Sequence, residues 1–159
     1  MPATELVGTL VARKEDKHKA AETDPRFPSG PWKGFWLQHG CAGRQWMKGL
    51  WLRFVDGQVE GGGSDMVGAF TFKGRYDLKT GQCLMTKQYL GGHLVQYDGA
   101  NQGDGMWLWG VWSIREQDSG GFHMWPHGVD DPTLRRNHAE VTTRQQEAAE
   151  ARLPAAAGV

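Results

Sequence analysis

The chain has 159 residues, the size of one ordinary domain, and its 18 Lys and Arg residues balance its 18 Asp and Glu residues. A net charge of zero excludes the basic excess typical of nucleic-acid-binding proteins, and it favours self-association. Hydrophobic residues make up 39% of the chain, and no stretch resembles a signal peptide or the roughly 18 apolar residues of a membrane span. We therefore expect a cytoplasmic protein that binds neither nucleic acid nor membrane.

The aromatic residues and glycines gather in the middle of the chain. All eight Trp, three Tyr and six Phe lie between Phe27 and Trp125, and 20 of the 23 Gly lie between Gly30 and Gly121. The flanks are polar or rich in Ala. The sequence thus predicts three parts, which are a polar N-terminal segment (residues 1–29) with a possible extra strand at Leu6–Val11, a β-barrel domain (residues 30–127), and a C-terminal helix with a frayed tail (residues 128–159).

Eight short runs rich in aromatic and β-branched residues follow one another, separated by turn sequences. The clearest period of two lies at the end of the fourth run, where Phe70, Phe72, Gly74 and Tyr76 alternate with the polar residues Thr71, Lys73 and Arg75. Asp56-Gly57 predicts a hairpin, because Gly accepts a positive φ angle. Asp118–Gly121 is interpreted as the last turn. The predicted strands are Trp32–His39, Gln45–Val55, Gln58–Gly63, Val67–Tyr76, Gln82–Tyr89, His93–Gly99, Met106–Arg115 and Phe122–Trp125.

The connections between these runs are short, which indicates the topology. Short connections join neighbouring antiparallel strands, whereas a Greek-key sandwich needs at least one long crossover. Eight strands in such a meander can close into a barrel, whose lumen holds packed side chains or one small ligand. After the last strand, Asp131 is a predicted N-cap, followed by Pro132 and the helix-favouring segment Thr133–Leu153. The predicted fold is all-β, an eight-stranded antiparallel up-and-down barrel with a C-terminal α-helix.

Two groups of motifs resemble known barrel families. The lipocalin-like resemblance rests on the Trp- and Gly-rich segments Gly34–Trp36 and Gly61–Phe70. The resemblance to the avidin/streptavidin family rests on Phe72–Asp77, which is similar to a Gly-Arg-Tyr-Asp strand end, on the spacing of Lys87, Tyr89, His93 and Tyr97, and on Trp112 at the place of a pocket Trp. His93 stands where the avidin family has a small hydroxyl residue. The resemblance therefore implies the barrel fold rather than biotin as the ligand.

One group of polar residues is predicted to face the lumen. If the fifth and sixth runs pair as a hairpin, Lys87 lies near His93, and His93 shares a strand face with Tyr97. His93 could then bind a polar-edged ligand or act as an acid or base, or it could make a structural hydrogen bond. Asp65 could cap backbone amides in an Asx turn or orient a ligand at the cavity mouth. The candidate ligand-binding residues are His93, Tyr97, Trp112, Lys87, Arg75, Asp65 and Trp36.

The cysteines give little sign of chemistry. Cys41 and Cys83 lack the spacing of a disulfide framework; they could pair with each other, but we expect both to be free, buried and inert. His39 could join them as a metal ligand, but a structural zinc site needs four ligands at closer spacing. We expect no metal and no cofactor.

Three functions remain open. No nucleophile elbow, zinc-protease helix or phosphate loop is present, which favours a non-enzymatic barrel that binds a small molecule in an aromatic lumen. A barrel enzyme of the isomerase or cyclase type would use His93 and Tyr97. A protein-interaction module or homo-oligomer would use the outer Trp-rich face, because Trp107 and Trp109 share one strand face and Trp112 lies on the other.

Overall fold

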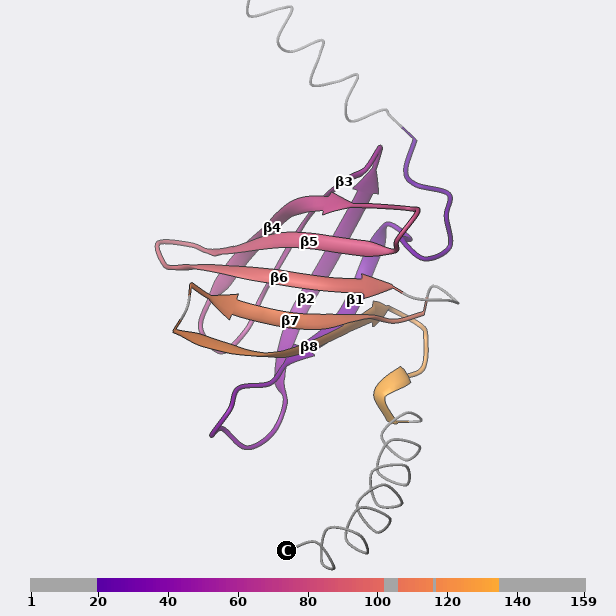
Figure 1. Ribbon diagram of the computed structural model, residues 1–159. Helices are drawn as coiled ribbons and strands as arrows, with labels where there is room; N and C mark the ends of the chain where they lie inside the picture. Colours follow the sequence, from indigo (N-terminus) through magenta and orange to yellow (C-terminus); the bar gives the residue numbers. More distant parts are fainter. Residues whose placement is uncertain (1–19, 102–105, 116, 135–159) are drawn as a thin grey trace, which may run out of the picture. The chain divides into compact units, whose positions relative to one another are not determined.

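The computed structural model describes residues 20–101, 106–115 and 117–134. Its strands form a closed barrel in which each strand pairs with the next and β8 pairs with β1, always antiparallel (Figure 1). This confirms the predicted up-and-down barrel. The strands are β1 (Gly30–Trp36), β2 (Gln45–Val55), β3 (Gln58–Ser64), β4 (Ala69–Tyr76), β5 (Gln82–Tyr89), β6 (Leu94–Asn101), β7 (Leu108–Ile114) and β8 (Asp118–Pro126).

The predicted strand bounds agree closely with the observed ones. Those of β2 and β5 are the same to the residue. The Asp56-Gly57 turn has positive φ angles of 51° and 79°, as expected for a tight hairpin turn whose twist matches that of the strands.

The interpretation of Asp118–Gly121 as a turn is wrong. The chain turns earlier, at Arg115, whose φ angle is 49°, and β8 already begins at Asp118. Gly120 lies in β8 opposite Trp112, and a Cβ there would overlap the carbonyl oxygen of Leu37 and lie 2.6 Å from Nε1 of Trp112, so this strand position requires glycine. Both neighbours are distant in sequence, and no pattern close to Gly120 indicates them.

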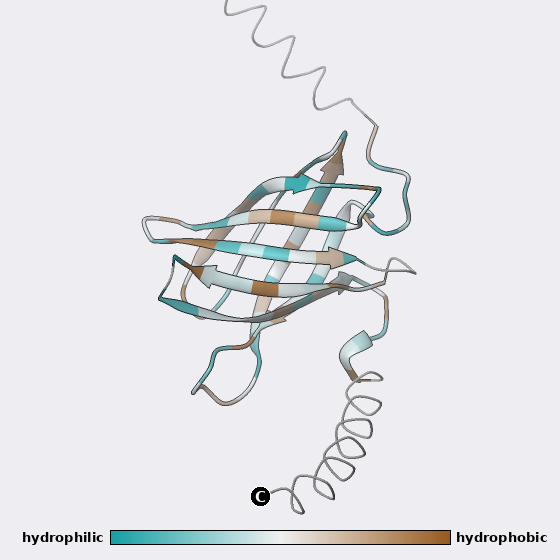
Figure 2. Cartoon of the chain, in the orientation of Figure 1, coloured by the Kyte–Doolittle hydropathy of each residue, from teal (hydrophilic) through white to brown (hydrophobic). Residues whose placement is uncertain are grey.

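Alternate residues of each strand fill the barrel, and hydrophobic and hydrophilic residues follow one another along the strands (Figure 2). On β4, Phe72 is fully buried while the neighbouring Thr71 and Lys73 are exposed. On β7, Trp112 points inward and Trp109 outward, as their parity predicts. The core therefore consists of the inward faces of all eight strands.

Gly74 permits the close approach of two strands. It pairs with Met85 in the β4–β5 ladder, and any Cβ at this position would overlap the carbonyl oxygen of Leu84. Inward glycines of this kind let a sheet bend tightly enough to close into a small barrel. Glycine here is thus a requirement of the fold, although its strand propensity is low.

Residues of the predicted polar N-terminal segment close one end of the barrel. Phe27 is fully buried, with its ring centroid 4.8 Å from that of Tyr76 and 5.2 Å from that of Phe54. The Tyr76 hydroxyl donates a 2.8 Å hydrogen bond to Glu22, and this bond is the main cause of the lowered pKa of the Glu22 carboxyl. The hydrophobic core thus begins before residue 30. The possible strand at Leu6–Val11 lies outside the described residues.

The second unit of the chain is Gly128–Val159, described to Leu134. Asp131 is an N-cap, as predicted, because its Oδ1 accepts a 2.9 Å hydrogen bond from the Thr133 amide at the start of a helical turn. The rest of the predicted helix, to Leu153, lies outside the described residues. In the part of the chain that the structure describes, no helix has the length and apolar character to cross a membrane.

Candidate functional site

One end of the barrel contains a cavity of about 270 Å³. Its walls come from the end of β1, the β3–β4 turn, and strands β5, β6 and β7, so that residues far apart in sequence meet there. The lining is mostly aromatic and aliphatic. The lining residues are Trp36, Gln38, Val67, Tyr89, His93, Val95, Tyr97, Trp112 and Ile114.

An ion pair lies behind this cavity. Lys87 points into the barrel from β5, and its Nζ lies 2.7 Å from Oδ2 of Asp65 in the β3–β4 turn. The two side chains are 1% and 0% exposed. A buried charge of either sign is costly to desolvate, so each group depends on the other.

Asp65 is the centre of a hydrogen-bond network. Besides Lys87, its Oδ2 accepts bonds from the Tyr89 hydroxyl at 2.7 Å and from the Trp36 indole at 3.1 Å. Its Oδ1 accepts a 2.9 Å bond from the Val67 amide, which is an Asx turn. The carboxylate therefore caps the turn, which is one of the two predicted alternatives, and it also fixes two aromatic side chains of the cavity wall.

The electrostatics of the pair follow from burial and from these bonds. Burial lowers the pKa of Lys87 to about 8, against the opposing effect of Asp65. For Asp65, burial acts to raise the pKa, but the hydrogen bonds from Lys87 and Tyr89 outweigh it and leave the pKa lowered. Lys87 is also surrounded by aromatic rings, and its Nζ lies 4.2 Å from the centroid of Phe70 and 4.7 Å from that of Tyr89.

The lowered pKa of Lys87 predicts an unusual pH dependence of stability. Between the folded pKa of about 8 and 10.5, the ordinary pKa of a lysine, the unfolded chain retains a proton that the folded chain releases. The free energy of unfolding should then rise with pH, by roughly 2 kcal/mol from pH 7.5 to 9.5. Urea unfolding of the wild type and of Lys87→Met across this range measures the difference. Equal slopes for the two proteins would contradict the lowered pKa.

The structure brings together six of the seven candidate residues. His93, Tyr97, Trp112 and Trp36 line the cavity, and Lys87 and Asp65 form the polar network behind it. His93 is exposed at the mouth, with its ring 5.1 Å from that of Tyr89. Tyr97 is 2% exposed, and its hydroxyl accepts a 3.2 Å bond from Lys87.

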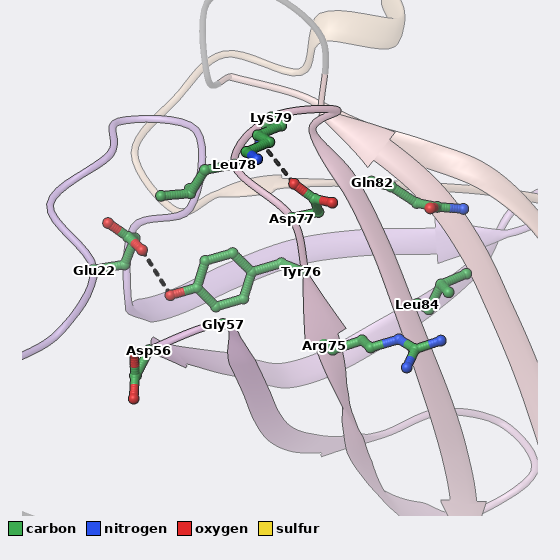
Figure 3. Close-up of a pocket in the computed structure, with 10 residues that line it drawn as sticks. All are labelled: Glu22, Asp56, Gly57, Arg75, Tyr76, Asp77, Leu78, Lys79, Gln82 and Leu84. Carbon is green, nitrogen blue, oxygen red and sulfur yellow. Dashed lines mark hydrogen bonds between the residues drawn. The ribbon is translucent and has the colours of Figure 1, made fainter.

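Arg75 is the candidate that the structure places elsewhere. It is exposed on the outer face of β4, because the inward positions of this strand belong to Phe72, Gly74 and Tyr76. Figure 3 shows Arg75 and Tyr76 extending to opposite sides of the strand, in a shallow groove that also contains residues of both charges. Arg75 was a candidate because it belongs to the Phe72–Asp77 motif of the resemblance, whereas strand parity places it on the face opposite Phe72 and Tyr76.

Tyr89 and Val95 are cavity residues that were not among the candidates. Both could have been found from period two, because Tyr89 shares its strand face with Lys87, and Val95 shares its face with Tyr97. Ile114 could have been found in the same way, because it shares its strand face with Trp112, whereas Gln38 and Val67 gave no such signal. They lie at or beyond strand ends, where the direction of a side chain depends on the turn.

The cysteines and histidines do not form a metal site in the described residues. Both cysteines are free, as expected, but Cys41 is exposed in a loop, so the expectation that both are buried is wrong for it. Cys83 is buried inside the barrel, and burial raises the pKa of its thiol to about 12. A thiol with such a pKa is a poor nucleophile and a poor ligand at neutral pH.

Comparisons with protein-family models, curated proteins and solved structures find no match. The closed barrel of eight antiparallel strands is the architecture expected from the lipocalin-like and avidin-like resemblance. On the outer face, Trp46, Trp51 and Trp109 are all more than 40% exposed. The site has to be interpreted from its own chemistry.

Proposed function

We propose that the protein binds a small, largely apolar molecule in the cavity lined by Trp36 and Trp112. The observation that carries this proposal is the cavity itself, about 270 Å³ of space at one end of the barrel with mostly aromatic and aliphatic walls. Ligand pockets usually measure about 300–1,000 Å³, so this one suits a small ligand. The space corresponds to about nine water molecules in the liquid, which suggests a ligand of one or two rings.

The shape of the walls supports a flat ligand. The indole rings of Trp36 and Trp112 meet edge to face, with centroids 5.9 Å apart and an interplanar angle of 80°. Such surfaces favour contact with another ring in an offset or edge-to-face arrangement. A ligand in the open end of an antiparallel barrel also agrees with the resemblance to avidin-like and lipocalin-like barrels.

The walls are held in place before any ligand arrives. The indole nitrogen of Trp36 donates to Asp65, and that of Trp112 donates a 2.8 Å bond to the carbonyl oxygen of Leu37. Tyr89 is fixed by its bond to Asp65. Side chains ordered in this way lose little conformational entropy on binding, which favours affinity for a rigid ligand.

A barrel enzyme that uses His93 and Tyr97 is less well supported. Both residues line the same cavity, but they are four positions apart, roughly 13 Å between Cα atoms along an extended chain. One is exposed at the mouth and the other is buried. A general acid and a general base acting on neighbouring atoms need to be closer than this. The arrangement therefore favours binding over catalysis.

The test compares ligand binding by the wild type with binding by a variant in which a larger side chain fills the cavity. A panel of neutral one- and two-ring compounds is screened by thermal shift, with the indole N–H signals of Trp36 and Trp112 followed by NMR. We expect binders to raise the unfolding temperature of the wild type by mass action. Val95→Trp should abolish the shifts, because Val95 lines the cavity.

Val111→Trp is the matched control, since Val111 is 54% exposed on the outer face of β7. It should bind the same compounds as the wild type. The proposal is wrong if no compound in the panel binds, or if Val95→Trp binds as the wild type does.

A further inference from the structure

Among the buried side chains that line the cavity, one has a hydrogen-bond donor to spare. The indole N–H groups of Trp36 and Trp112 and the hydroxyl proton of Tyr89 are all donated to protein oxygens. The Tyr97 hydroxyl differs, because its bond with Lys87 uses the oxygen as acceptor. An ammonium group has no lone pair to accept a proton in return. The Tyr97 proton therefore has to point elsewhere.

No described residue accepts that proton. The only hydrogen bond of the Tyr97 side chain among the described residues is the one it accepts from Lys87, and Oδ2 of Asp65 already accepts three other bonds. Tyr97 is 2% exposed and lines the cavity. A buried donor without an acceptor destabilises the protein, and a suitable ligand atom would remove this cost. Accepting a bond from an ammonium also makes a hydroxyl a stronger donor.

The charge behind the cavity limits which acceptor fits. The ammonium of Lys87 and the carboxylate of Asp65 neutralise each other at 2.7 Å, and neither side chain is open to solvent. A carboxylate ligand would lose its hydration without gaining a net countercharge. An uncharged acceptor, such as a carbonyl oxygen, loses far less on entering an apolar cavity.

We infer that Tyr97 selects the ligand: it is a neutral ring compound whose carbonyl-type oxygen accepts a hydrogen bond from the Tyr97 hydroxyl, while Lys87 donates to the same hydroxyl and Asp65 fixes Lys87. The inference rests on the proposed function and names the ligand class for that site. Tyr97 is thus a specificity-determining residue, and Lys87 is a positioning residue that acts through it.

The test compares ligands of the same shape that differ in the acceptor. Binding of the ketone 1-tetralone, its hydrocarbon counterpart tetralin and the anion 1-naphthoate is measured by isothermal titration calorimetry. In Tyr97→Phe, the affinity ratio of ketone to hydrocarbon should fall about tenfold, the equivalent of one buried hydrogen bond. Tyr76→Phe is the matched control, because its hydroxyl lies at the other end of the barrel and bonds to Glu22. It should keep the wild-type ratio.

A second measurement applies even if Tyr97→Phe does not fold. The carbonyl ¹³C signal of labelled 1-tetralone bound to the wild type should move downfield of its position in an apolar solvent, as hydrogen-bonded carbonyls do. An unshifted signal, an unchanged ratio in Tyr97→Phe, or tighter binding of 1-naphthoate would each overturn the inference while leaving the cavity a binding site. If the wild type binds neither 1-tetralone nor tetralin and no other compound of the panel, the proposed function itself fails.

Discussion

Replacing Asp65 by alanine is expected to lower the free energy of unfolding by about 3–5 kcal/mol, the usual cost of breaking a buried ion pair by removing one partner. The change leaves the ammonium of Lys87 in the barrel with the Tyr97 hydroxyl and aromatic faces as its remaining partners. It also removes the acceptor of the Trp36 indole and the Tyr89 hydroxyl. Urea unfolding at pH 7, followed by circular dichroism, measures the loss.

Two further variants distinguish the loss of the buried ion pair from the effect of removing any carboxylate. Asp98→Ala removes an exposed aspartate on β6 whose side chain bonds to Gln82, and it should cost less than about 0.5 kcal/mol. Adding Lys87→Met to Asp65→Ala removes the unpaired charge, and the double variant should recover part of the lost stability. Similar losses of unfolding free energy in Asp65→Ala and Asp98→Ala would show that the buried ion pair does not stabilise the barrel as its geometry indicates.

Gly74→Ala is expected to destabilise the barrel by about 3 kcal/mol or more, which is large for a single added methyl group. The new Cβ would overlap the carbonyl oxygen of Leu84 and lie 2.7 Å from the Cα of Met85, both of them backbone atoms of the paired strand. A side chain could rotate away, but a backbone can yield only if the β4–β5 pairing is distorted. Denaturant unfolding, together with amide hydrogen exchange on β4 and β5, tests this.

Gly121→Ala is the matched control for Gly74→Ala, because it makes the same substitution in a strand where no backbone atom lies close. Gly121 lies inside β8, and a Cβ there would meet its nearest neighbour, the carbonyl oxygen of Gly110, at 3.8 Å, an ordinary contact. The free energy of unfolding of Gly121→Ala should differ from that of the wild type by no more than about 0.5 kcal/mol. If both substitutions have the same effect, strand propensity rather than close approach governs the cost at Gly74.

The barrel could be predicted because its signals are local. Period-two alternation and turn glycines depend on residues close in sequence, which is why β2 and β5 have the predicted bounds. The errors occur where distant contacts override local preference. Gly120 lies against the ring of Trp112, and Phe27 enters the core from the segment that was predicted to be a polar N-terminal flank.

The candidate site could be predicted only in part, for the same reason. Strand parity grouped His93 with Tyr97 and separated Trp112 from Trp109, and the structure shows that the faces of Tyr97 and Trp112 are the inward ones. Strand parity could not show that Asp65, 22 residues before Lys87, folds back from a turn to neutralise that amine inside the barrel. The size of the cavity depends on how all eight inward faces pack, and no single stretch of sequence encodes it.

Closure of the ring has a consequence for the order of events during folding. Seven of the eight strand pairings join sequence neighbours and can form as hairpins, whereas the β1–β8 seam must bring Trp36 opposite Phe122. The entropy of closing a long loop is therefore concentrated in this last step. Trp36 and Trp112, whose rings meet edge to face in the cavity wall, lie on opposite sides of the seam. The cavity thus forms only when the β1–β8 seam closes, and a molecule bound there would stabilise the closed barrel against opening of the seam.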